Sequence, residues 1–222
     1  MSQHIGIVAC SAEGAALCYS TICVEGAARF GPYDHPEVSL HTYSLACYMD
    51  FIHGGDWDGV AGLMLRSAQK LAQIGADFLI CPDNTIHRVM PQVRARSPLP
   101  WLHISECVAA EASARGYQHP GLTGTKYLVD SEVYPPSYTR PTPEERDEIN
   151  RIIFDELVYG RFLPASRRYF QAVIARMRDT GCDAVVLGCT EIPLLIRPED
   201  SPLPTLDSTR LLARAALARA AG

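Results

Sequence analysis

Two short runs of reactive side chains stand out in the sequence, and each directly follows an apolar stretch. The first run, DNT (residues 83–85), follows FLICP (78–82), and the second, CTE (189–191), follows AVVLG (184–188). A carboxylate and a thiol can each remove or return a proton, and the amide and hydroxyl groups beside them can hydrogen-bond an anion. The two runs are therefore candidates for the two sides of one proton-transfer site.

Both runs belong to an internal repeat. GADFLICPDNTI (75–86) matches GCDAVVLGCTEI (181–192), which aligns Asp83 with Cys189. Two further pairs of segments keep nearly the same offset: 99–105 with 203–209, and 5–19 with 120–134. Three matched pairs in one order predict two similar α/β halves.

The elements that must position these runs can be read from periodicity. Apolar residues recur at helical spacing ahead of each block: Val60, Leu63, Met64, Ala68 and Leu71, then Phe170, Val173, Ile174 and Met177. Gly75 and Gly181 supply the stops of these two helices. TPEE (142–145) predicts a capping box with proline at the first helical position, and LLARAALARA (211–220) predicts a terminal helix packed against the first half.

Short buried runs that alternate with helices predict an α/β fold with parallel sheets. The segments 97–101 and 201–205 indicate the crossovers between the halves. We therefore expect a first half of residues 1–98 plus 205–222 and a second half of residues 99–204. Ligands of parallel α/β sheets bind at the carboxyl ends of strands, where both reactive runs lie.

Composition excludes several classes of protein. Hydrophobic residues make up 47% of the chain, charged residues 20%, and the net charge is −5 without a Lys/Arg cluster, so we expect no nucleic-acid binding. No apolar run approaches membrane-spanning length, and the first residues do not read as a signal peptide, so we expect no membrane association. The eight cysteines form no CxxC pair and fit no zinc spacing, which predicts a cytoplasmic protein without a metal site.

An acid and a thiol on opposite faces of a small molecule suit one reaction well. One group removes a proton from a carbon and the other returns a proton to the opposite face, which inverts the stereocentre. Such a reaction needs no metal or organic cofactor if hydrogen bonds stabilise the carbanion. The predicted activity is racemisation at a carbon next to a carboxylate.

The chain resembles the aspartate/glutamate racemase family, which also holds hydantoin racemases, maleate isomerases and arylmalonate decarboxylases. GCTEIP (188–193) is similar to the second catalytic motif of that family, DNTIH (83–87) to the first, and GLTGTKY (121–127) to the loop that binds the substrate carboxylate. The resemblance implies two Rossmann-like halves with pseudo-two-fold symmetry and the active site between them. It also implies cofactor-independent racemisation of a small carboxylate, often in a homodimer.

The expected catalytic pair is Asp83 and Cys189. The expected substrate-binding residues are Ser11, Tyr48, Asn84, Thr85, Thr125, Lys126 and Thr190, and the expected supporting residues are Cys81, Glu191 and His87. Several of these have structural alternatives, because Asp83, Asn84 and Thr85 can cap a helix and His87 can form a local hydrogen bond. Cys10, Cys18, Cys23, Cys47, Cys107 and Cys182 are expected in the core or without a role.

The chain departs from the family pattern in its charged residues. Asp83 stands where the family carries its first catalytic cysteine. No Lys or Arg occurs in HTYSLACYMDFI (41–52), where Tyr48 takes the place of a basic residue, and no Lys occurs in IFDELVYG (153–160). Members that act on acidic substrates carry basic residues in these two segments. We therefore expect a substrate with a neutral or aromatic side chain.

The two members of an Asp/Cys pair also differ in their ordinary pKa values, and therefore in which of them holds a proton at rest. Ordinary pKa values of about 3.9 and about 8.5 predict a resting carboxylate at Asp83 and a resting thiol at Cys189. Turnover should be faster in the direction that starts from this state. Three alternatives stay open: a decarboxylase, a cis–trans isomerase that uses Cys189 as a nucleophile, and a binding protein in which Asp83 pairs with a ligand ammonium.

Overall fold

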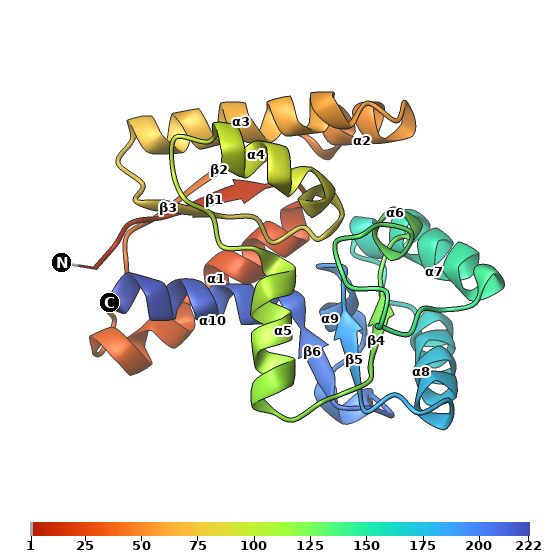
Figure 1. Ribbon diagram of the computed structural model, residues 1–222. Coiled ribbons are helices and arrows are strands. Elements are labelled where there is room, and N and C mark those ends of the chain that lie inside the picture. The colour runs from red at the N-terminus through yellow and green to blue at the C-terminus, as the bar shows by residue number, and fades with distance from the viewer. Residues whose placement is uncertain (1) are drawn as a thin grey trace.

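The computed structural model describes residues 2–222 and contains two parallel three-stranded sheets, which lie side by side in Figure 1. The first sheet has the order β2-β1-β3 and the second the order β4-β5-β6. The strands are β1 (Ile5–Ala9), β2 (Val38–Thr42), β3 (Phe78–Ile80), β4 (Pro120–Thr123), β5 (Ala184–Leu187) and β6 (Thr205–Asp207). The predicted α/β fold with two parallel sheets is confirmed.

The internal repeat is visible in the sheet topology. A single parallel bridge from Leu79 to Trp101 extends the first sheet beyond β3, and one from Gly121 to Thr139 extends the second beyond β4. The two extended sheets then have the same order, with β1 equivalent to β4, β3 to β5, and the Trp101 segment to β6. The three repeated segment pairs of the sequence thus form corresponding strands.

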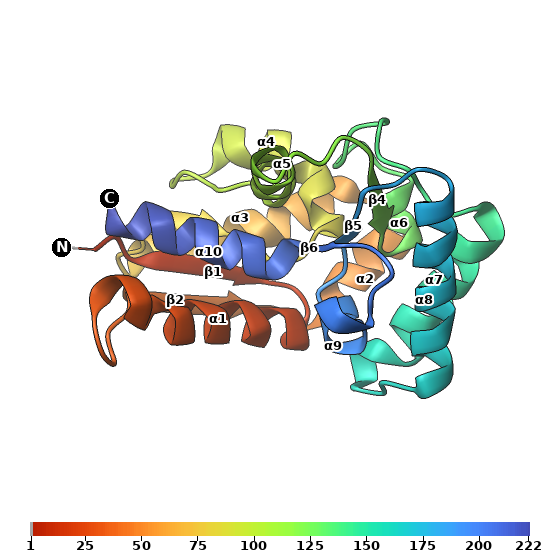
Figure 2. The ribbon, with the colours of Figure 1, turned by 90° about the horizontal axis from the view of Figure 1, so that it is seen from below.

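Helices cover the faces of both sheets. The helices are α1 (Ala12–Phe30), α2 (Leu45–His53), α3 (Trp57–Gln73), α4 (Met90–Arg96), α5 (Ile104–Ala114), α6 (Lys126–Val129), α7 (Pro143–Asp155), α8 (Pro164–Asp179), α9 (Ile192–Leu195) and α10 (Ser208–Ala221). Short 3₁₀ turns span Thr85–Val89, Leu157–Tyr159 and Pro198–Asp200. Helix α3 lies on one side of the first sheet, and α1 and α10 lie together on the other (Figures 1 and 2).

The helix signals of the sequence are confirmed. All the apolar stripe residues of α3 and α8 are buried, and the glycines after these helices, Gly75 and Gly181, have φ of +91° and +100°. Those values fall in the left-handed region that glycine adopts readily. Helix α7 begins with the predicted capping box, in which Thr142 Oγ1 accepts from the Glu145 N–H and Glu145 Oε2 accepts from the Thr142 N–H at 2.8 Å.

Two helices join the halves. Helix α10 packs Leu212, Ala216 and Leu217 into the core beneath the first sheet, as predicted for the terminal helix. Helix α5 contributes Ile104 to that core and Val108 to the core of the second half.

The predicted boundary at residue 205 differs from the structure by one strand. β6 pairs with β5 in the second sheet, so the chain returns to the first half only at α10. The proline-rich segments at 97–101 and 201–205 lie at the crossovers between the halves. At each crossover the extended segment, at Trp101 or in β6, still pairs with the sheet of the half that the chain is leaving. Across residues 2–222, no helix combines the length and the apolar character needed to cross a membrane.

Candidate active site

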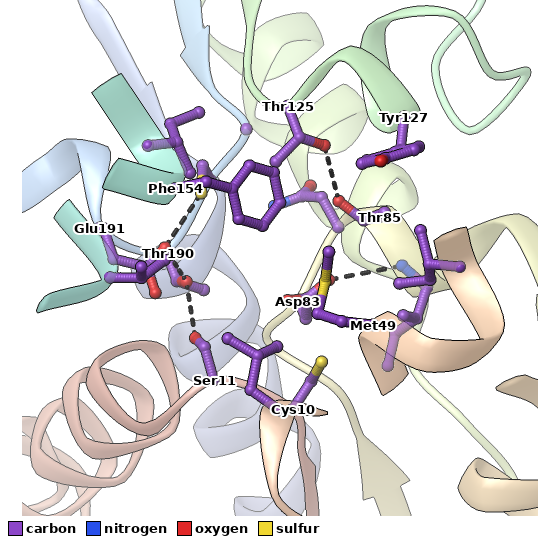
Figure 3. A pocket seen from close by; sticks show the side chains of 18 residues that line it. Cys10, Ser11, Met49, Asp83, Thr85, Thr125, Tyr127, Phe154, Thr190 and Glu191 are labelled. Atoms are coloured by element: carbon purple, nitrogen blue, oxygen red, sulfur yellow. Dashed lines mark hydrogen bonds between the residues drawn. The ribbon is translucent and has the colours of Figure 1, made fainter. Parts of the chain in front are cut away.

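A cavity lies where the carboxyl ends of β1, β3 and β5 meet, and Figure 3 shows its 18 lining residues. Both halves contribute side chains to it. The polar lining residues are Cys10, Ser11, Asp83, Asn84, Thr85, Thr125, Cys189, Thr190 and Glu191. Asp83 and Cys189, aligned by the sequence repeat, therefore line one cavity from the two different halves.

The first wall is formed by the segments that follow β1 and β3. These strands pair in parallel with Ile7 opposite Ile80, so Cys10 and Asp83, each three residues further along, leave the sheet at the same level. The Asp83 carboxylate accepts a hydrogen bond from the Ile86 N–H at 3.4 Å, which caps the turn that follows. The capping role and a cavity position thus coexist in one residue.

The charge state of Asp83 is set by its surroundings. Burial raises the pKa of Asp83 to about 6, and the Glu191 carboxylate on the other wall adds to this increase. Hydrogen bonds from the Ile86 and Thr85 N–H groups and from the Cys10 thiol act in the opposite direction. Asp83 is therefore a carboxylate above about pH 6 with a proton affinity well above that of an exposed aspartate.

The second wall follows β5 and contains a hydrogen-bonded chain. Cys189 Sγ donates to Glu191 Oε2 at 2.9 Å, and Thr190 Oγ1 donates to the same oxygen at 2.7 Å. Because the Thr190 hydroxyl uses its proton there, Ser11 Oγ donates to it across 3.0 Å. Burial raises the pKa of the Cys189 thiol well above its usual range, and Glu191 and Asp83 contribute to this increase.

Hydroxyl and amide groups lie beside this acid–thiol pair. Thr85 Oγ1 and Thr125 Oγ1 are 2.9 Å apart and join the two halves, and Thr125 also caps α6 by accepting from the Leu128 N–H. Both ends of the Asn84 side-chain amide are hydrogen-bonded, because its Nδ2 donates to Ser208 and its Oδ1 accepts from Tyr134. Asn84 therefore fixes the backbone of the first wall, while Thr85 and Thr125 present hydroxyls to the cavity.

The rest of the cavity is apolar. Its hydrophobic residues are Leu45, Met49, Ile52, Ile86, Tyr127, Ile153, Phe154 and Val158, which come from both halves. Figure 3 shows the Phe154 ring between the Thr125 side and the Glu191 side of the cavity. No lysine, arginine or histidine is among the residues that line it in the described chain.

Two residues expected to bind substrate lie outside this lining. Tyr48 is fully buried in the core of the first half, and Met49, the next residue of α2, lines the cavity instead. Lys126 is exposed and its Nζ lies 5.6 Å from the centre of the Tyr127 ring.

Cys81 and His87, two of the residues expected to support the catalytic pair, also lie outside the cavity lining. Cys81 is fully buried, and its thiol lies 3.9 Å from the Asp83 backbone oxygen. His87 hydrogen-bonds the Cys81 carbonyl through Nε2 at 2.9 Å, which is the local role considered from the sequence. Burial holds the pKa of His87 well below its usual range, so the ring is neutral. Glu191, in contrast, lines the cavity directly.

Sequence reasoning missed Cys10, which was expected in the core or without a role. Its side chain is 4% exposed yet lines the cavity next to Asp83, and Figure 3 shows its sulfur on the Asp83 side. The available signal was its position directly after the first strand, immediately before Ser11. Within residues 2–222 no cluster of three or more His, Cys, Asp and Glu side chains is arranged to hold a metal ion.

The Asp/Glu/hydantoin racemase family model matches residues 22–216, and the chain belongs to that family. The broad specificity amino-acid racemase RacX of Bacillus subtilis is 22% identical over 190 residues, which cover 82% of this chain and 80% of RacX. The family resemblance inferred from the two motifs is thereby confirmed.

Solved structures agree with the family assignment. A candidate Asp/Glu racemase from Yersinia pestis superposes with a TM-score of 0.89 at 28% identity, covering 99% of this chain and 100% of the other. An aspartate racemase homologue from Pyrococcus horikoshii superposes with a TM-score of 0.82 at 25% identity, with the same two coverages. The predicted class of enzyme, an isomerase of the racemase type, is confirmed at the level of this family.

Proposed function

We propose that this protein is a cofactor-independent amino-acid racemase that inverts the α-carbon by two-base proton transfer between Asp83 and Cys189. The observation that carries the proposal is that these two residues, one from each half, line the same cavity. General acid–base groups must lie within reach of the proton they move, and a two-sided cavity offers one such group to each face of a carbon.

The charge states favour one direction of turnover. At neutral pH Asp83 is a carboxylate, since its pKa is about 6, and Cys189 is a thiol, since its pKa is raised well above the usual range. Asp83 takes the α-proton, and the Cys189 thiol gives its proton to the opposite face of the carbanion. This leaves a protonated Asp83 and a Cys189 thiolate beside Glu191, which is the state from which the opposite enantiomer reacts.

The lining also indicates how a substrate is held. The Thr85 and Thr125 hydroxyls share one hydrogen bond and keep one proton free, which is suited to the substrate carboxylate, and the carboxylate of Glu191 is suited to its ammonium. An acidic side chain would meet an apolar lining and no cation, whereas a leucine-, methionine- or phenylalanine-like side chain would contact Phe154 and its apolar neighbours. We therefore propose a substrate with an apolar or aromatic side chain.

Proton exchange in D₂O tests the proposal directly. The protein is incubated with L- and D-leucine, methionine, phenylalanine, aspartate and glutamate, and α-deuteration is followed by NMR while enantiomer ratios are measured by chiral chromatography. We expect deuteration and racemisation of at least one apolar amino acid, with little activity on aspartate and glutamate. The matched variants Asp83→Asn and Cys189→Ala should each slow racemisation by about 10²-fold or more.

Three results would contradict the proposal. Release of CO₂ from an aryl malonate would indicate a decarboxylase, and conversion of maleate to fumarate would indicate a cis–trans isomerase. Measurable binding of an amino acid without α-hydrogen exchange would indicate a binding protein. The relation to the racemase family also leads us to propose a cytoplasmic homodimer, which light scattering on the purified protein and fractionation of the source cells would test.

A further inference from the structure

The first wall contains a thiol that the two-base scheme does not use. Cys10 and Asp83 line the cavity together, and the pairing of Ile7 with Ile80 places both residues at the same level of the sheet. On the second wall, the Cys189 thiol donates to the Glu191 carboxylate at 2.9 Å. Each wall therefore carries one thiol and one carboxyl group among the residues that line the cavity.

The two pairs differ in which member faces the cavity. On the first wall Asp83 is partly exposed and Cys10 is 4% exposed, so the carboxylate is the accessible group. On the second wall Cys189 is partly exposed and Glu191 is 2% exposed, so the thiol is the accessible group. The more exposed member of each pair is better placed to exchange a proton with a substrate, and the more buried member is placed to support it.

We propose that Cys10 is the positioning residue of the first wall, whose thiol donates a hydrogen bond to the Asp83 carboxylate and holds it ready to accept the substrate proton. This inference rests on the proposed function for the role of Asp83, but not for the contact itself. No bond to Cys10 is made or broken: its proton stays on sulfur, and the substrate proton goes to the carboxylate oxygen. A donor to a carboxylate stabilises the charged form and fixes its orientation.

Several other titratable groups lie near Asp83 and also influence its pKa. From its own strand segment there is Cys81, from α2 there is Tyr48, and from the second wall there are Cys189 and Glu191. Burial raises the pKa of Cys81, Tyr48 and Cys189, so these three groups stay neutral at pH 7. The remaining neighbour is the Glu191 side chain, which is still present when Cys10 alone is substituted.

The test is a carboxyl titration of the full-length protein labelled with ¹³C at the aspartate side chains, with the Asp83 signal assigned from Asp83→Asn. Cys10→Ala removes the donor and Cys10→Ser keeps one, so these variants form a matched pair. We expect the Asp83 midpoint to rise by about half to one pH unit in Cys10→Ala. In Cys10→Ser it should stay at or below the wild-type value, and in Cys182→Ala, a buried control in the second half, it should not move.

An unchanged midpoint in Cys10→Ala, or equal shifts in Cys10→Ala and Cys10→Ser, would overturn the inference. If Cys10→Ala does not fold, Cys10→Val replaces it as the variant without a donor. The acid limb of kcat/KM for α-proton exchange gives a second readout and should move upward in Cys10→Ala alone. Absence of exchange in the wild type would contradict the proposed function, whereas the carboxyl titration would still decide the role of Cys10.

Discussion

The two walls of the cavity carry the same pair of functional groups with their positions exchanged. The wall after β3 presents a carboxylate with a thiol behind it, and the wall after β5 presents a thiol with a carboxylate behind it. Both walls sit on equivalent strands of a repeated fold, so the backbone alone does not make them different. The comparison teaches that this fold fixes where a proton-transferring group stands and leaves its chemical identity to single residues.

The largest loss of activity is expected when the accessible thiol of the second wall, Cys189, is removed. Cys189→Ala leaves the second wall without a group that can deliver a proton, so racemisation should fall by about 10²- to 10⁴-fold. Chiral chromatography of product formed from the preferred substrate measures this loss. Cys182→Ala, which removes a thiol buried in the same half, should retain activity within about twofold. Equal activity in Cys189→Ala and the wild type would exclude Cys189 from the chemistry.

The free-energy cost of the Asp83 carboxylate on the first wall should appear in the stability of the protein. The folded-state pKa of Asp83, about 6, lies above its unfolded value, so the native state binds the proton more tightly and this residue lowers stability as pH rises from about 4 to 7. Asp83→Asn, which can still cap the turn, should raise the free energy of unfolding by about 1 to 3 kcal/mol at pH 8. Urea denaturation should show the two proteins converging below pH 4. A difference that is the same at both pH values would contradict the raised pKa.

Substituting Glu191, the buried carboxylate of the second wall, tests how strongly one carboxylate influences the reactive groups of both walls. Glu191 raises the pKa of both Cys189 and Asp83, so Glu191→Gln should lower both. Alkylation of Cys189 by iodoacetamide at pH 8 should become faster, by roughly tenfold. Mass spectrometry of the peptide that contains Cys189 separates this reaction from that of the other cysteines. Slower alkylation in Glu191→Gln would mean that Glu191 activates the thiol instead.

The smallest effect is expected at Lys126, which the sequence suggested as a substrate contact. Its side chain is exposed and outside the cavity lining, so Lys126→Ala should change kcat/KM by less than about twofold. Thr125→Val, one residue earlier, removes a cavity hydroxyl and the cap of α6, and it should raise KM by a larger factor. Steady-state kinetics on both variants distinguishes the two positions, and a large KM increase in Lys126→Ala would place the cation at the substrate after all.

The repeated motifs made much of this arrangement predictable. Aligning Asp83 with Cys189 was enough to place both at one cavity, because equivalent strand ends of two related sheets face each other. The pairing register of β1 with β3 is a long-range property, so the contact between Cys10 and Asp83 could not be read from the chain. Which helix residue faces the cavity could not be read from the chain either, because one step along α2 separates Tyr48 in the core from Met49 in the cavity lining.

The way α5 and α10 join the halves has a consequence for the order of folding. The core beneath the first sheet combines Ile5 and Phe78 with Leu212 and Leu217. Ile5 therefore packs against residues that are synthesised more than 200 positions after it. During synthesis the face of the first sheet that α10 will cover stays open until nearly the whole chain has emerged. We expect the two halves to reach their native state together, in a single cooperative step, instead of one after the other.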